Sequence, residues 1–215
     1  PAPSPPLTHP RMLDAPITLG LLIANVAISL YALTANMSLI NDLSFRPRRI
    51  EEDGEYYRFF TAGFVHGGMA HLAFNMITLY FFGPLLEGVL GAAAFLILYF
   101  GSDLCANALT FAMHRSDPNY GSIGASGAIS GVLFAFCLFA PFAKLYVFFA
   151  IPMPAILFAV LYVVVSVYAI GQREQGAMGG IAHEAHLGGA VGGVLITIAL
   201  VPAAVGEFVR AIQQV

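Results

Sequence analysis

Six long apolar stretches follow one another along the chain. They cover residues 15–37, 69–90, 92–113, 125–142, 145–170 and 182–202. A helix that crosses the bilayer core needs about 20 mostly apolar residues, and each stretch approaches or exceeds that length. The pattern therefore predicts an all-α, polytopic membrane protein with six transmembrane helices. Pro152 and Pro154 fall early in the fifth stretch and predict a kink or a later helix start there.

The remaining segments define the predicted organisation. Residues 1–14 form an N-terminal tail, residues 15–204 the membrane domain, and residues 205–215 a C-terminal tail. The first residue is not methionine, which is consistent with a longer natural tail. Residues 38–68 form a long loop that mixes charged with aromatic side chains. Such a mixture predicts a segment at the membrane interface.

The composition supports the membrane class and excludes others. Hydrophobic residues make up 59% of the chain and charged residues 10%, with a mean hydropathy of +0.81. So few charges cannot cover the surface of a soluble fold of this size. A net charge of −3 argues against a nucleic-acid partner. Cys105 and Cys137 lie in apolar stretches and are interpreted as buried thiols, not as a disulfide framework.

Polar residues inside the predicted helices are the candidate functional groups, because they are costly in lipid. His71 and Asn75 lie near the start of the second helix, Ser126 at the start of the fourth, and His186 near the start of the sixth. These three helices run in the same direction, so their first turns lie at similar depth. The sequence therefore predicts that the four side chains meet on the side of the long loop.

The local spacing indicates a role for each group. His71 and Asn75 are four residues apart and share a helix face, which suits two donors of an oxyanion hole. A polar pair that bonds to neighbouring helices is the alternative. Ser126 lies in the first turn of its helix, where free backbone N–H groups favour a developing negative charge. Its alternative role is a small residue at a helix contact.

Small residues predict that two of these helices touch. Gly188 and Gly192 form a G-x-x-x-G face beside His186, and Gly189 and Gly193 form a second one. Gly127 and Gly131 form a matching face after Ser126. Close contact would bring the hydroxyl and the imidazole to the roughly 3 Å needed for base activation of a serine.

Other polar residues receive different predictions. His183, Glu184 and His186 do not match the spacing of a zinc protease, so we expect neither a metal nor another cofactor. Asp103 is interpreted as a structural carboxyl group, with a third member of a catalytic triad as the alternative. His66 and His114 lie at loop edges and are expected to be solvated.

Several ordered motifs resemble the rhomboid intramembrane serine proteases. His71-x-x-x-Asn75, Gly124-Ala-Ser126-Gly127 and Ala185-His186-Leu-Gly188-Gly-Ala-Val-Gly192 are similar to three helix motifs of that family. Glu87 matches its structural glutamate, and Tyr57-Arg58 stands where the family has a Trp-Arg pair. Ser130 occupies a place where an aromatic ring can pack on the catalytic histidine in relatives.

The resemblance implies a six-helix rhomboid-like bundle and a serine endopeptidase with a Ser126–His186 dyad. His71, Asn75 and the Ser126 backbone N–H would bind the oxyanion, while Arg58, Glu87, Gly127, Gly188 and Gly192 would be structural. The substrates would be transmembrane proteins in lipid, and we expect a prokaryotic cell membrane. The resemblance also implies cytoplasmic termini, whereas the excess of arginine in the long loop favours a cytoplasmic loop.

The expected mechanism gives two more segments a role. A substrate helix would enter sideways past the fifth helix, and water would enter under residues 171–180 with Met178 as a cap. Two alternatives are an inactive relative that binds transmembrane helices and a small transporter. A transporter is expected to carry polar groups through its full depth or an inverted repeat. Here the polar groups gather at one side.

Overall fold

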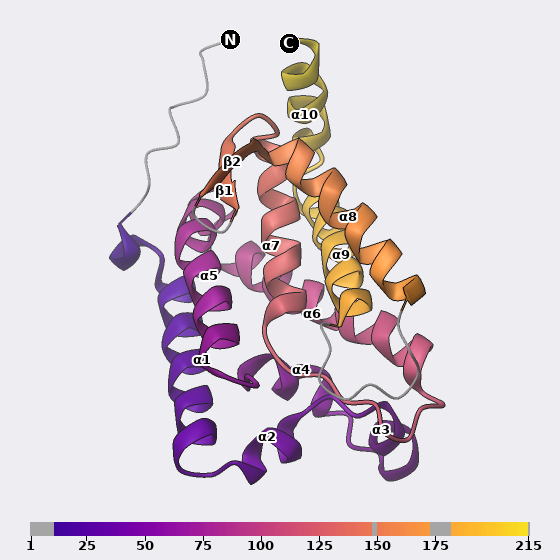
Figure 1. The fold of residues 1–215 in the computed structure, drawn as a ribbon. Coiled ribbons are helices and arrows are strands. Elements are labelled where there is room, and N and C mark those ends of the chain that lie inside the picture. Colours follow the sequence, from indigo (N-terminus) through magenta and orange to yellow (C-terminus); the bar gives the residue numbers. More distant parts are fainter. Residues whose placement is uncertain (1–10, 148–149, 173–181, 215) are drawn as a thin grey trace.

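The computed structural model describes residues 11–147, 150–172 and 182–214, and its longest helices pack side by side (Figure 1). This arrangement confirms the predicted all-α membrane bundle. Four helices are long and apolar enough to cross a membrane, whereas α7 and α8 are shorter apolar helices. The six helices are α1 (Pro16–Thr34), α5 (Met69–Leu90), α6 (Ala92–His114), α7 (Ser126–Phe139), α8 (Ala155–Gln172) and α9 (His183–Leu200).

Helix α7 lies at the centre of the bundle, between α5, α6, α8 and α9 (Figure 1). Ten of its residues are buried, on every face of the helix. A helix that is apolar all round is stable where other helices surround it. Val132 and Ala135 of α7 are fully buried and belong to the main core together with Leu79, Phe95 and Leu98. The helix that begins with Ser126 is therefore the one most shielded from lipid.

Helices α6, α7 and α9 approach one another so closely that glycine is required at the contacts. A Cβ at Gly188 would lie 2.9 Å from the Cys105 carbonyl oxygen, and one at Gly193 would overlap the backbone of Gly131. Small residues allow helix backbones to come this near. The Gly189 and Gly193 face of α9 thus meets the Gly127 and Gly131 face of α7, as expected from the sequence. The Gly188 and Gly192 face of α9 packs against α6 instead.

The long first loop folds into short helices at one end of the bundle (Figure 1). They are α2 (Ser38–Leu43), α3 (Pro47–Asp53), α4 (Arg58–Thr61) and the 3₁₀ helix η2 (Ala62–Phe64). Phe45 and Ile50 are buried with Tyr120 in a separate small core. Phe45 also pairs through its backbone with Ser122, and each N–H donates to the other carbonyl. The loop is therefore attached to the segment that leads into Ser126.

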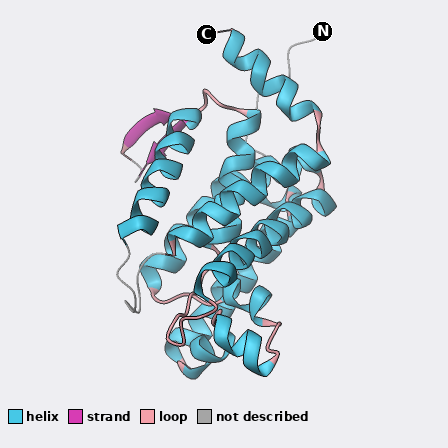
Figure 2. Ribbon diagram, turned by 90° about the vertical axis from the view of Figure 1, so that its right-hand side faces the viewer, coloured by secondary structure: helices cyan, strands magenta, loops and turns pink. Residues whose placement is uncertain are grey.

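The opposite end differs from the sequence prediction. Strands β1 (Lys144–Val147) and β2 (Ile151–Pro154) form an antiparallel hairpin, seen at the edge of the bundle in Figure 2. Helix α8 starts only at Ala155, so the predicted start at residue 145 was wrong and the late start expected from the prolines is correct. Pro152 and Pro154 lie in β2 and place no kink within α8. A 3₁₀ turn, η1 (Met12–Asp14), precedes α1, and α10 (Ala203–Gln213) occupies most of the predicted C-terminal tail.

Candidate active site

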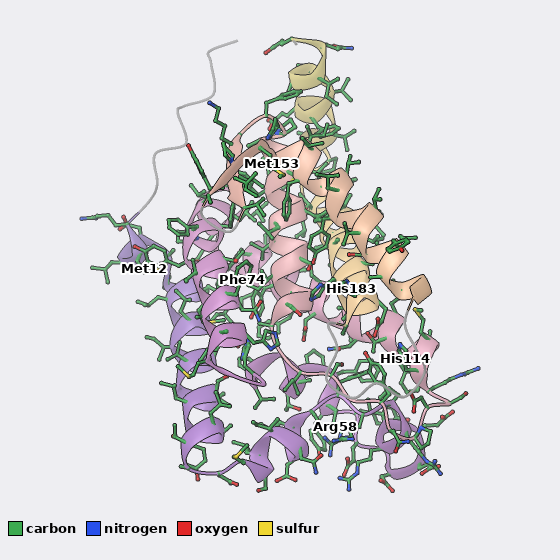
Figure 3. All side chains as sticks on the ribbon, viewed as in Figure 1. Met12, Arg58, Phe74, His114, Met153 and His183 are labelled. Atoms are coloured by element: carbon green, nitrogen blue, oxygen red, sulfur yellow. The ribbon has the colours of Figure 1, made fainter. Side chains whose placement is uncertain are left out.

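The first turns of α5, α7 and α9 surround one cavity of about 790 Å³. His71 lies in the first turn of α5, Ser126 is the first residue of α7, and His186 lies in the first turn of α9. Asn75 follows His71 by one turn. All four side chains line this cavity. Figure 3 shows its surroundings, with Phe74 on α5 and His183 on α9. Side chains that are up to 115 residues apart in the sequence, from three parallel helices, therefore face one space.

The Ser126 hydroxyl and the His186 ring lie on helices that touch next to them. A Cβ at Gly127 would lie 3.8 Å from the Ala185 carbonyl oxygen, and these two residues are the direct neighbours of Ser126 and His186. Within the described parts of the chain, no hydrogen bond joins Ser126 Oγ to the His186 ring. Catalytic hydrogen bonds are often long before substrate binds. The approach of Gly127 to Ala185 thus brings the first turns of α7 and α9 together beside the two groups.

Asn75 supplies an amide donor without a protein partner. Its side chain is 5% exposed, and its Nδ2 forms no hydrogen bond within the described residues. A buried, unsatisfied donor costs about 1–3 kcal/mol, so such a group calls for an explanation. Because Asn75 lines the cavity beside Ser126, a negatively charged oxygen in that cavity would satisfy it.

Gly124 allows His71 to lie against the segment before α7. Its φ of +109° favours glycine, and a Cβ there would come within 2.5 Å of His71 Cε1. The Gly124 N–H donates to the Ala62 carbonyl oxygen at 2.9 Å, which holds the turn. The glycine before Ser126 is thus required both by its conformation and by the histidine ring beside it.

His66 is buried, and the expectation of a solvated side chain was wrong. Ser29 Oγ lies 2.8 Å from His66 Nδ1, and the Ala125 N–H donates to Nε2 at 3.4 Å. Burial lowers the pKa of His66 to about 3, with a smaller contribution from the nearby His71. A neutral imidazole therefore links α1 to the turn that carries Ser126. Its place at a loop edge gave no sign of this burial.

His114 also departs from its prediction, because it packs against a buried network. Its ring stacks on Tyr120 with centroids 3.9 Å apart, and its Nε2 lies 3.2 Å from Glu184 Oε1. Tyr120 donates its hydroxyl hydrogen to the same oxygen at 2.5 Å. Glu184 is 1% exposed. This network attaches the segment before α7 to the start of α9, two residues from His186.

Tyr162 of α8 is a neighbour of His186 that the sequence did not reveal. The two rings lie 6.0 Å apart with an angle of 28° between their planes. The Tyr162 hydroxyl lies 2.5 Å from Ser130 Oγ, which in turn donates to the Ser126 carbonyl oxygen at 2.7 Å. The aromatic neighbour expected near position 130 thus comes from another helix. A tyrosine within an apolar stretch was the only signal in the sequence.

Arg58 and Glu87 make extensive contacts away from the cavity. Arg58 is 1% exposed and donates to Glu55 and to the Asn41 and Ser44 carbonyl oxygens. Its guanidinium also lies 5.2 Å from the centre of the Tyr57 ring, so tyrosine provides a contact for arginine at this position. Glu87 accepts hydrogen bonds from the Ile17 and Thr18 N–H groups and from the Thr18 hydroxyl, which joins α5 to α1.

Asp103 lies behind the active-site turn. It is 5% exposed, accepts a 3.4 Å hydrogen bond from Asn107, and would lie 3.4 Å from a Cβ added at Gly127. The described residues place no hydrogen bond between Asp103 and His186. This position favours a structural carboxyl group over a third member of a triad. The expected cap, Met178, lies outside the described residues.

Comparison with known proteins assigns the chain to a family. The Rhomboid domain profile matches residues 53–203. This chain belongs to the rhomboid family. RHOMBOID-like protein 12, mitochondrial, from Arabidopsis thaliana is 27% identical over 82% of the chain and 56% of its own length. Rhomboid protein 1, mitochondrial, from Saccharomyces cerevisiae is 34% identical over 62% of the chain and 39% of its own length. Rhomboid protease GluP from Bacillus subtilis is 38% identical over 37% of the chain and 15% of its own length.

The chain therefore spans less than two thirds of each of these relatives. The family and the apolar helices make it an integral, multi-pass membrane protein. The relatives include both bacterial and mitochondrial proteins, so the comparisons do not favour the expected prokaryotic cell membrane.

Proposed function

We propose that this rhomboid is a serine endopeptidase that cleaves transmembrane segments of other membrane proteins. The observation that carries the proposal is that one cavity is lined by the Ser126 hydroxyl, the His186 imidazole and two further donors, His71 and Asn75. The buried Asn75 amide without a partner adds to it, because an oxyanion is the group that such a donor would stabilise. In this proposal a lipid bilayer surrounds the protein, and transmembrane proteins are its substrates.

The proposed reaction begins with Ser126 Oγ attacking a substrate carbonyl carbon. His186 accepts the hydroxyl proton as the C–O bond forms, and the carbonyl oxygen becomes an oxyanion. The Asn75 amide, the His71 ring and the Ser126 backbone N–H donate hydrogen bonds to that oxyanion. The C–N bond then breaks, and His186 gives its proton to the leaving amine. Water hydrolyses the acyl-enzyme with His186 again as base.

Helix α8 is the proposed entry gate for the substrate. It packs against α7 and α9 and connects to β2 at one end. Tyr162 joins the gate to the base, because its ring stacks beside His186. Outward movement of α8 would therefore withdraw support from the imidazole until the gate closes again. Substrate entry and base orientation are coupled in this arrangement.

The test is labelling and cleavage by purified protein in detergent. The wild type is expected to react with a fluorophosphonate and to cut a transmembrane substrate, whereas Ser126→Ala does neither and unfolds at the wild-type temperature. His186→Ala should lose both reactions as well. Labelling that persists in Ser126→Ala would refute the nucleophile. A folded wild type without labelling or cleavage would favour an inactive protein that binds helices.

A further inference from the structure

Arg46 is the one arginine of the first loop that lacks a carboxylate partner. Arg48 pairs with Glu52, while Arg49 and Arg58 both approach Glu55. Residues 38–68 are all described, and none of their carboxylates lies within 4 Å of Arg46. No carboxylate of the described residues therefore pairs with the positive charge at this position.

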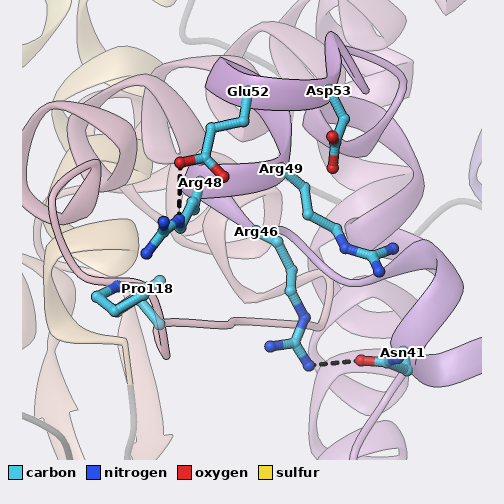
Figure 4. Close-up of a pocket in the computed structure, with 8 residues that line it drawn as sticks. Asn41, Arg46, Arg48, Arg49, Glu52, Asp53 and Pro118 are labelled. Atoms are coloured by element: carbon cyan, nitrogen blue, oxygen red, sulfur yellow. Dashed lines mark hydrogen bonds and ion pairs between the residues drawn. The ribbon is translucent and has the colours of Figure 1, made fainter.

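Neutral groups hold the Arg46 side chain in place. Its Nη2 donates to Asn41 Oδ1 at 2.5 Å, and its Nε donates to Ser44 Oγ at 3.2 Å. Figure 4 shows Arg46 beside Asn41, apart from the Arg48–Glu52 pair. Partial burial lowers the pKa of Arg46, and the charges of Arg58 and Arg49 lower it further. A fixed guanidinium that is repelled by its neighbours favours an anion from outside the chain.

The place of Arg46 indicates which anion. Among the described residues that line the active-site cavity, it is the only arginine, lysine, aspartate or glutamate. The adjoining backbone of Phe45 pairs with Ser122, and a Cβ at Gly121 would lie 3.5 Å from Arg46 Cζ. The guanidinium thus lies over the segment that leads to Ser126. A peptide lying along this segment would pass Arg46 on its way to the nucleophile.

We infer that Arg46 selects substrates with an acidic side chain near the scissile bond, an inference that rests on the proposed endopeptidase activity. Ser126 follows Gly121 by five positions, and an extended chain covers at most about 3.6 Å per residue. A substrate peptide that lies extended along the stretch from Gly121 to Ser126 would place its acidic residue within about five positions of the cleaved bond. Arg46 is thus a specificity residue and takes no part in bond cleavage.

The experiment scans one aspartate through a transmembrane substrate. It occupies in turn each of six positions on either side of the scissile bond, with asparagine at the same position as the neutral match. For wild type, aspartate at one or two positions is expected to raise kcat/KM about fivefold over asparagine, the range of a partly exposed ion pair. Arg46→Gln should lose this preference, and Arg46→Glu should prefer lysine there instead.

Arg48→Glu is the matched control, because Arg48 lies two residues away and does not line the active-site cavity. It should keep the wild-type aspartate preference. The inference is overturned if wild type cleaves all substrates of the scan equally, if the preference survives Arg46→Glu, or if Arg48→Glu abolishes it equally. Wild type that shows no Ser126-dependent labelling would instead refute the proposed function, so the two failures are distinguishable.

Discussion

Gly189→Ala tests whether the contact between α7 and α9 positions the catalytic groups. A Cβ at Gly189 would lie 2.8 Å from the carbonyl carbon of Gly127 and 3.0 Å from its Cα. The Gly127 carbonyl oxygen is the nearest atom of all, and ordinary contacts of a Cβ begin near 3.4 Å, so the helices must separate by more than about 0.6 Å. Since the atoms in the way are backbone, no change of rotamer relieves the overlap.

The separation has two measurable consequences. Overpacking of this kind costs about 1–3 kcal/mol of stability, which lowers the Tm of a chain this long by about 2–12 °C. The same shift moves His186 away from Ser126. Because a misplacement of about 1 Å can reduce a reaction rate about 100-fold, we expect fluorophosphonate labelling to slow by about 10- to 100-fold.

Gly88→Ala is the control for this substitution. Gly88 lies in α5, and a Cβ there would meet nothing within 4 Å. Alanine is more favourable than glycine in a helix, so the Tm should be unchanged or slightly raised. Thermal unfolding in detergent and the labelling rate are measured for both variants. If Gly189→Ala unfolds and reacts like the wild type, the helix contact does not position the dyad.

Three further predictions concern single side chains. Asn75→Ala should lower kcat about 10²- to 10³-fold in a cleavage assay while KM changes little; an unchanged kcat would exclude the amide from the oxyanion hole. Tyr162→Ala should lower kcat and alter its pH profile, whereas Tyr162→Phe keeps the ring beside His186 and should lose less; equal losses would exclude a role for the ring. The pKa of His66 is about 3 in the folded protein and about 6.5 in the unfolded chain. The unfolded chain therefore binds the proton more readily. The contribution of His66 to the free energy of unfolding should therefore be fully present above pH 6.5 and fall by up to about 1.4 kcal/mol per pH unit below it. The Tm measured between pH 8 and 5 follows this loss. A Tm without acid dependence in this range would contradict the burial of a neutral ring.

The membrane bundle could be predicted from the sequence because lipid imposes a strong and local requirement. Each span must be apolar over about 20 residues, and no distant contact is needed to recognise it. The least accurate boundary was that of α8. Residues 144–147 and 151–154 are apolar enough to extend a span, yet they form two paired strands, in which Pro152 and Pro154 donate no backbone hydrogen bond. Hydropathy alone does not distinguish a strand from a helix in so short a run.

The four cavity residues were predictable for a related reason. Alternate membrane helices run in the same direction, so the first turns that carry His71, Ser126 and His186 lie at one depth. The helical period puts Asn75 on the face of His71. The small-residue faces of α7 and α9 predicted their contact. The helical period does not fix the distance between two side chains, and so the sequence could not decide whether Ser126 Oγ and the His186 ring form a hydrogen bond in this structure.

The sequence by itself thus determined the class of protein, the relative directions of the helices and the chemical types that face the cavity. Only the tertiary structure decided which partners support them: Tyr162 beside His186, Ser29 beside His66, and Arg46 beside Gly121. The physical reason is the range of the forces involved. Apolar length and helical period are local properties of the chain, whereas these contacts join residues from different helices and loops, whose packing no short stretch of sequence encodes.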